Sequence, residues 1–100
     1  MLEIDESIVG DLTIGKDTRL RGSVTGNVTV ATGAKLELHG MIVGSLFVEK
    51  GASAEVRGTV SQTLVNRGGA VEIWGMVGEG IVDYEEGGTT VHAGAMIGDP

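Results

Sequence analysis

The chain has 100 residues, of which 41% are hydrophobic and 21% charged. This composition is that of one folded domain, and it excludes both a disordered tail and a membrane span. The 7 basic and 14 acidic residues give a formal net charge of −7, which disfavours nucleic acids and anionic membrane surfaces as partners. With no cysteine, disulfides, thiolate catalysis and cysteine-ligated zinc are excluded as well.

The first residues, MLEIDESIVG, are acidic and lack the basic and apolar regions of a signal peptide. We therefore expect a cytoplasmic protein. The repeat described next begins near residue 8, so we expect residues 1–100 to form a single domain whose coils span about residues 8–97.

Glycine recurs about every 18 residues in two separate series, which is the mark of a repeat architecture. The two series are Gly22, Gly40, Gly58, Gly75, Gly94 and Gly15, Gly33, Gly51, Gly69, Gly87. We expect both to mark corners, where the backbone turns sharply or approaches another segment closely.

Between the glycines, apolar and polar residues alternate with a period of two, which indicates strands with one buried face. Each coil holds three such runs of about five or six residues. No segment has helical spacing. The sequence therefore predicts an all-β, three-sided parallel β-solenoid with coils of about 18 residues. The expected inward columns are Leu20, Leu38, Val56, Ile73; Val24, Ile42, Val60, Val77; and Val28, Leu46, Leu64.

The register is ambiguous in the later coils, because one residue is missing between Gly58 and Gly75. Either Leu64 or Val65 is the inward residue there, and Asn66 either points inward or sits at a corner. The pattern does not assign inward positions after Tyr84.

Coils that contain "LRGSV" or "VRGTV", with aliphatic columns and no catalytic motif, resemble the bactofilins, a family of polymer-forming bacterial cytoskeletal proteins. The resemblance implies a right-handed β-helix that polymerises end to end without a nucleotide. The chain departs from the family's common layout in lacking an apolar, membrane-targeting N-terminus, so a membrane role is not expected.

No group of residues predicts catalysis. His39 and His92 are expected three coils apart, too far to share a metal ion. Glu37, Glu55 and Glu72 form an outward column that we interpret as a solvated charged face, since a calcium site needs six to eight oxygen ligands. We therefore expect no enzymatic activity, no cofactor and no metal.

Two sets of residues are candidates for contacts with other molecules. Several apolar residues are expected to point outward, and such residues, when contiguous, mark an interface. Arg57 is expected to lie beneath Trp74 in a cation–π contact, and a lone exposed tryptophan is also a frequent contact residue. The alternative is a tryptophan side chain that simply lies along the sheet surface. The candidate lateral interface comprises Met41, Val43, Phe47, Trp74 and Met76.

The ends of the solenoid form the second set. A parallel solenoid leaves unpaired backbone groups and an apolar cross-section at each end, and neither terminal segment predicts a capping helix. We expect end-to-end self-association into oligomers or filaments through Ile8, Leu12, Ile14, Val91 and Ile97. The alternative is a small acidic binding module, such as an immunity-type inhibitor that docks on a basic partner protein.

Overall fold

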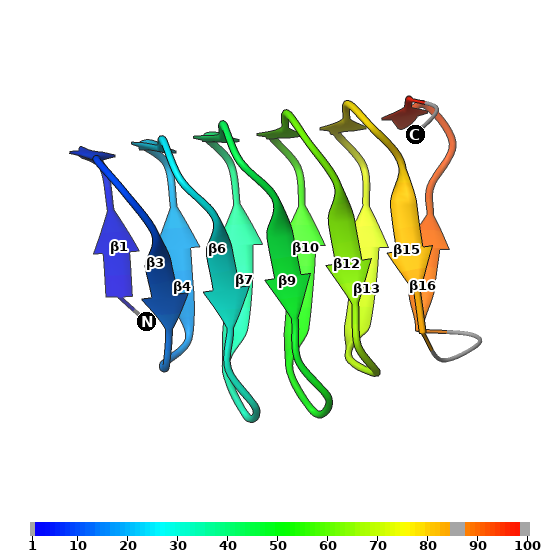
Figure 1. Ribbon diagram of the computed structural model, residues 1–100, viewed down its shortest axis with the longest axis horizontal. Helices are drawn as coiled ribbons and strands as arrows, with labels where there is room; N and C mark the ends of the chain where they lie inside the picture. The colour runs from blue at the N-terminus through cyan, green and yellow to red at the C-terminus, as the bar shows by residue number, and fades with distance from the viewer. Residues whose placement is uncertain (1, 85–87, 99–100) are drawn as a thin grey trace.

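The computed structural model describes residues 2–84 and 88–98, which form 17 short strands and no helix. The strands build three parallel sheets, named here A, B and C (Figure 1). Sheet A holds β1 (Leu2–Ile4), β4 (Thr18–Leu20), β7 (Lys35–Leu38), β10 (Ser53–Val56), β13 (Ala70–Ile73) and β16 (Thr89–Val91). Sheet B holds β2 (Ser7–Ile8), β5 (Ser23–Val24), β8 (Met41–Ile42), β11 (Thr59–Val60), β14 (Met76–Val77) and β17 (Met96–Ile97). Sheet C holds β3 (Leu12–Ile14), β6 (Val28–Val30), β9 (Leu46–Val48), β12 (Leu64–Asn66) and β15 (Ile81–Asp83).

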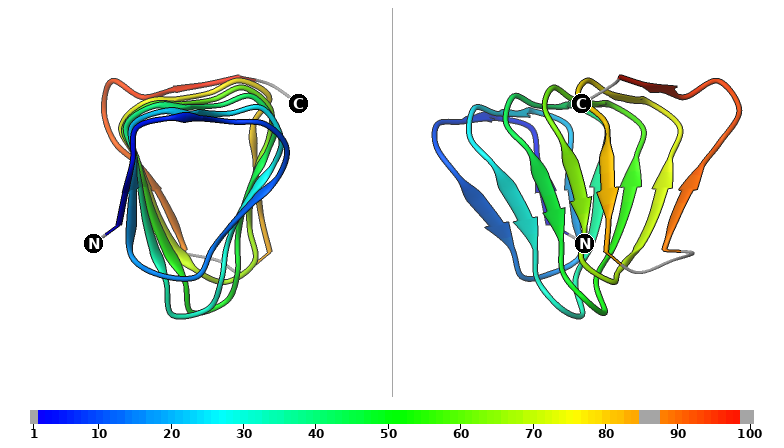
Figure 2. Two further views of the ribbon diagram at one scale, coloured as in Figure 1. Left: turned by 90° about the vertical axis from the view of Figure 1, so that its left-hand side faces the viewer. Right: turned by 45° about the vertical axis from the view of Figure 1, so that its right-hand side comes forward.

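Each coil contributes one strand to each sheet, and β16 and β17 follow the five complete coils. Neighbouring coils pair in parallel on all three sides. Seen from the N-terminal end, the chain turns clockwise as it recedes from the viewer, so the solenoid is right-handed (Figure 2, left). The predicted three-sided parallel β-solenoid is confirmed.

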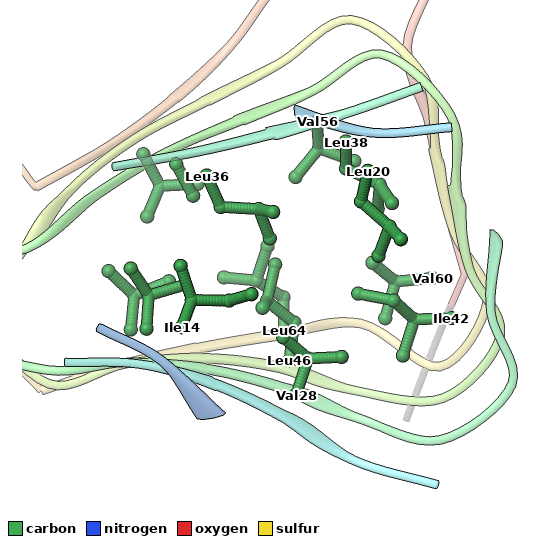
Figure 3. Packing of buried hydrophobic residues seen from close by; sticks show 14 of the residues in the cluster. Ile14, Leu20, Val28, Leu36, Leu38, Ile42, Leu46, Val56, Val60 and Leu64 are labelled. Carbon is green, nitrogen blue, oxygen red and sulfur yellow. The ribbon is translucent and has the colours of Figure 1, made fainter. Parts of the chain in front are cut away.

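The interior is filled by ladders of aliphatic side chains, one ladder for each inward position (Figure 3). Every residue of the three predicted inward columns is 0% exposed. Burying each of these side chains contributes about 1.5–3 kcal/mol relative to leaving it in water. Because no coil buries its apolar face alone, stability comes from stacking one coil on the next.

The strands have only two to four residues, fewer than the five or six expected. The corners take the remaining residues. The solenoid also begins earlier than expected: β1 pairs with β4, so the first coil starts at Leu2 and not near residue 8. This coil is short, because Ser7 pairs with Ser23, 16 residues later.

The first glycine series forms the corner between sheets A and B. A Cβ atom at Gly40 would overlap the backbone carbonyl oxygen of Gly22, and Gly58 and Gly75 stand in the same relation to the preceding coil. Only glycine allows so close an approach. Gly94, the expected last member of the series, does not occupy this corner position. It lies in the longer connection between β16 and β17, and the residue that pairs with Met76 is Met96, two residues later.

The second glycine series does not form one column, contrary to expectation. Gly33 and Gly51 adopt φ angles of 85° and 80° at equivalent corners, but in the next coil Gly68 has the positive φ, 116°. Gly69 instead packs where a Cβ would strike Val48 and the Ala52 carbonyl. Two further members do not fit either: Gly15 belongs to the shorter first coil, and Gly87 lies outside the described residues.

The structure decides which residues of β12 point inward, a question that the sequence left open. Leu64 is the inward residue and Val65 points outward, so the missing residue comes from the corner after β12, which spans only residues 67–69. Asn66 occupies the inward position paired with Val48 and is 0% exposed. Its Oδ1 accepts hydrogen bonds from the Gly69 and Gly68 amides at 2.7 and 3.1 Å, so its side chain closes this shortened corner.

Polar side chains connect successive coils at the corner between sheets B and C. Asp11 Oδ1 accepts a hydrogen bond from the Asn27 amide, and Asn27 Oδ1 accepts one from the Ser45 amide, both at 2.8 Å. Ser45 Oγ accepts a further bond from the Thr63 amide at 3.3 Å. This ladder satisfies backbone donors that would otherwise lack a partner within the sheets.

Candidate functional site

The first coil exposes inward-facing apolar side chains at the N-terminal end of the solenoid. Leu2 is 54% exposed, and Ile4, Ile8 and Leu12 are half-buried. A pocket of about 350 Å³ opens there, lined by Leu2, Ile4, Leu12 and Ile14 among others. Of the predicted contact residues, Ile8 and Leu12 lie at this end, whereas Ile14 is only 3% exposed.

The other end is also apolar. Val91 pairs with Ile73 at an inward position, yet it is 47% exposed because no later strand among the described residues covers it. Ile97, also inward by its pairing with Val77, is half-buried, as is Ile81 on sheet C. The predicted contact residues Val91 and Ile97 therefore lie together at the C-terminal end.

At both apolar ends, the outermost strands also present a free backbone edge. In the part of the chain that the structure describes, β1, β2 and β3 pair only with the second coil, and β15, β16 and β17 pair only with the coil before them. Figure 1 shows these strands at the two extremes of the long axis. An unpaired parallel edge is a template for another strand.

Sheet B presents an uncharged outer face. None of its six strands contains a charged residue. Met41, Val43 and Met76 lie on this face and are 42%, 40% and 41% exposed. Met96, which the sequence analysis did not identify, extends the same column and is 66% exposed.

The other two predicted lateral residues lie elsewhere. Phe47 points outward from β9 on sheet C, where it is half-buried beside Val65 in the next coil. The guanidinium carbon of Arg67 lies 5.1 Å from the centre of its ring, and Arg67 also forms an ion pair of 3.2 Å with Glu49. Phe47 therefore does not join the exposed methionines in one patch.

Trp74 lies at the corner between sheets A and B, within a stack of side chains from three coils. The guanidinium carbon of Arg57 is 4.3 Å from its ring centre, which confirms the predicted cation–π contact. In the next coil, the imidazole of His92 stacks on the indole with centroids 4.2 Å apart and planes within 4°. Because both ring faces are occupied, only the ring edge is available to another molecule.

Sheet A carries the charged face. Glu37, Glu55 and Glu72 form the expected outward column, but each meets a basic group and does not simply extend into water. The ammonium of Lys35 lies 2.8 Å from Glu55. This hydrogen bond lowers the pKa of Glu55 below its ordinary value and raises the pKa of Lys35 above its own. The face is a network of local ion pairs.

The described residues contain no cluster of three or more histidine or acidic side chains suited to a metal ion. His39 and His92 lie three coils apart along one outward column, as expected, and each pairs with a glutamate of sheet A. Among the same residues, no helix is long and apolar enough to cross a membrane.

Sequence reasoning missed Leu2, Ile4 and Met96. The alternation in Leu-Glu-Ile was a signal for the first strand, but three residues are too few to establish a period. Met96 follows the longer connection that contains Gly94, which breaks the repeat before the last strand. No protein-family model, curated protein or solved structure matches this chain.

Proposed function

We propose that this protein is a non-enzymatic structural subunit that associates with further copies of itself through the ends of its solenoid. The observation that carries the proposal is that, at both ends, exposed inward-type apolar residues coincide with strand edges that no other described strand covers. Stacking another copy would bury Leu2 and Val91 and extend sheets A and B, whose last strands are β16 and β17. The resemblance to bactofilins supports the same role, and we propose a cytoplasmic location with it.

Charge opposes this association at low ionic strength. Residues 1–17 contain five acidic residues and one basic residue, and residues 76–100 contain five acidic residues and none that is basic. Any pairing of ends therefore brings like charges together. Because salt screens charges over about 10 Å at 0.1 M, we expect association to strengthen as salt is added.

A small acidic binding module that docks on a basic partner is the second candidate, favoured by the same acidic ends. The two functions respond to salt in opposite ways. Docking on a basic partner is weakened by salt, since screening removes the attraction.

The experiment is sedimentation velocity on the purified chain over a range of concentrations, at about 0.05 M and about 0.5 M salt. We expect oligomers that grow with concentration and with salt. The variant Val91→Lys places a charge on the C-terminal cross-section and should shorten them. Thr90→Lys is the matched control, because Thr90 is the neighbouring residue of the same strand and points outward.

A monomer at high micromolar concentration in both salts would contradict self-association and leave the acidic binding module as the better reading. Equal loss of oligomers in Val91→Lys and Thr90→Lys, with the β-type circular dichroism spectrum retained, would contradict the end contact itself.

A further inference from the structure

We infer that sheet B is a second, lateral contact surface, and that its occupant is sheet B of another copy of this chain. The inference rests on the proposed end-to-end association, which it extends from single filaments to paired ones. The surface consists of two outward columns that run along the solenoid axis: Ser23, Met41, Thr59, Met76, Met96 and Thr25, Val43, Ser61, Gly78, Gly98.

The distribution of charge selects a second copy as the occupant. A chain with a net charge of −7 repels its copies through any face that carries acidic groups. Sheet A holds a column of glutamates, and the ends of the chain are acidic. Sheet B has no charge in any of its strands, so it is the face on which two copies approach with the least repulsion and the smallest desolvation cost.

The same distribution disfavours other occupants. An anionic membrane attracts proteins through clusters of lysine and arginine side chains next to the apolar surface, and the strands of sheet B contain neither. At the adjoining corner, Arg21 pairs with Glu3 and Arg57 with Glu55, so these two basic groups are already partnered. A basic partner protein would be drawn to the acidic ends and to the glutamates of sheet A. Thr59, which lies between Met41 and Met76 in the same column, is small and uncharged, so no charged residue interrupts the methionines there.

Sheet C is the competing face, but two of its outward apolar residues are less available, and only Val82 among the described ones is as exposed as Met76. Phe47 is covered by Arg67 and half-buried, and Val65 is half-buried. On sheet B, in contrast, Met41, Met76 and Met96 are all exposed. Methionine side chains are flexible and adapt their shape to an opposing surface.

Filaments make such a contact effective. The strands of sheet B have two residues each, so one pair of subunits buries less than the roughly 800 Å² per partner of a standard interface. Such a contact between two free subunits is weak. In two filaments it repeats at every subunit, and linked contacts reinforce one another without any new interaction.

The test compares Met76→Glu on sheet B with Val82→Glu on sheet C. Both wild-type side chains are 41% exposed and lie in the same coil, so the two variants add the same charge at equal exposure. Negative-stain microscopy measures filament width, and sedimentation measures filament length. We expect paired filaments for the wild type and Val82→Glu, and single filaments of similar length for Met76→Glu.

Cysteine cross-linking provides a readout that does not need filaments. The chain has no cysteine, so every cross-link reports an introduced one. With a short bis-maleimide at high protein concentration, Thr59→Cys on sheet B should form covalent dimers, and Val65→Cys, outward on sheet C in the same coil, should form few.

The outcomes separate this inference from the proposed function. If the wild type forms no filaments but Thr59→Cys cross-links, end-to-end association is wrong and the lateral contact stands. If filaments form and Met76→Glu leaves their width unchanged, or if Val82→Glu alone separates them, the sheet B contact is wrong. Wild-type binding to anionic vesicles that Met76→Glu abolishes, without cross-linking at Thr59→Cys, would overturn it in favour of a membrane.

Discussion

The indole of Trp74 and the imidazole of His92 stack face to face across one step of the solenoid, with ring centres 4.2 Å apart. His92 Nε2 also lies 3.1 Å from Glu72 Oε1, which belongs to β13 in the preceding coil. Arg57 covers the opposite face of the indole. This group of four side chains ties β16 to the body of the solenoid on its outer surface.

We therefore expect Trp74→Leu to loosen the last coil more than the rest. An aromatic stack is worth about 0.5–1.5 kcal/mol and an exposed cation–π contact about 0.5–1 kcal/mol. Hydrogen exchange should rise first at the amides of β16, whereas the central coils remain protected. Trp74→Phe keeps a ring in the stack, so its exchange rates at the β16 amides should lie between those of Trp74→Leu and those of the wild type. Uniformly faster exchange along the whole chain would contradict this assignment.

Ile42→Asp tests the inward register of sheet B. Ile42 is 0% exposed, and a carboxylate at this position has no partner and no route to water. We expect loss of the folded state in thermal melts followed by circular dichroism. Met41→Asp is the control, because Met41 precedes Ile42 on the same strand and points outward. Equal melting of the two variants would show that the register is wrong.

Gly40→Ala tests the close corner between sheets A and B. The added Cβ would overlap the carbonyl oxygen of Gly22, and its nearest neighbours are all backbone atoms of residues 21 and 22, so no side chain can move aside. A destabilisation of about 2 kcal/mol or more is expected, measured by urea denaturation. The same substitution at Gly15 meets no atom within 4 Å, so Gly15→Ala should be neutral or slightly stabilising.

Asn66→Leu tests the buried amide in the shortened corner. Leucine fits an apolar ladder position, but it leaves the Gly68 and Gly69 amides without their acceptor. Since an unsatisfied buried donor costs about 1–3 kcal/mol, we expect a net loss of stability even though a hydrophobic residue is added. Asn27→Leu removes a single bond at an exposed corner and should cost less in the same urea experiment.

The Lys35–Glu55 pair predicts a dependence of stability on pH. Because the folded pKa of Glu55 is lowered, its contribution is present above the unfolded value of 4.5 and is lost as the pH falls through the folded value. The folded pKa of Lys35 is raised, so its contribution is present below 10.5 and is lost as the pH rises further.

Both groups are partly exposed, so we expect the pair to contribute about 0.2–1 kcal/mol at neutral pH. Glu55→Gln should reduce stability by that amount near pH 7 and by less in acid, as measured by urea denaturation across pH. A constant difference from neutral to acid pH would be inconsistent with the ion pair.

Periodicity was sufficient to predict the interior. Side chains of a strand alternate between two faces, and equivalent positions of successive coils stack, so Leu20, Ile42 and Leu46 were assigned to the core from spacing alone. The outward neighbours Arg57 and Trp74 were paired by the same reasoning, because a column of the repeat is a column in space.

The tertiary structure alone decided how the outward residues are grouped. Alternation states whether a side chain points in or out, but only the corners determine which of three sheets it belongs to, and this separated Phe47 from Met41 and Met76. Short or irregular coils carry too few repeats for a period to be recognised, which is why Leu2 and Met96 were found only in the structure. The sequence by itself thus determined which residues form the core and how long each coil is, because stacking repeats the same burial at each step. Which outward residues share a sheet, and where the first and last strands lie, depend on backbone turns that hydrophobic patterning does not encode.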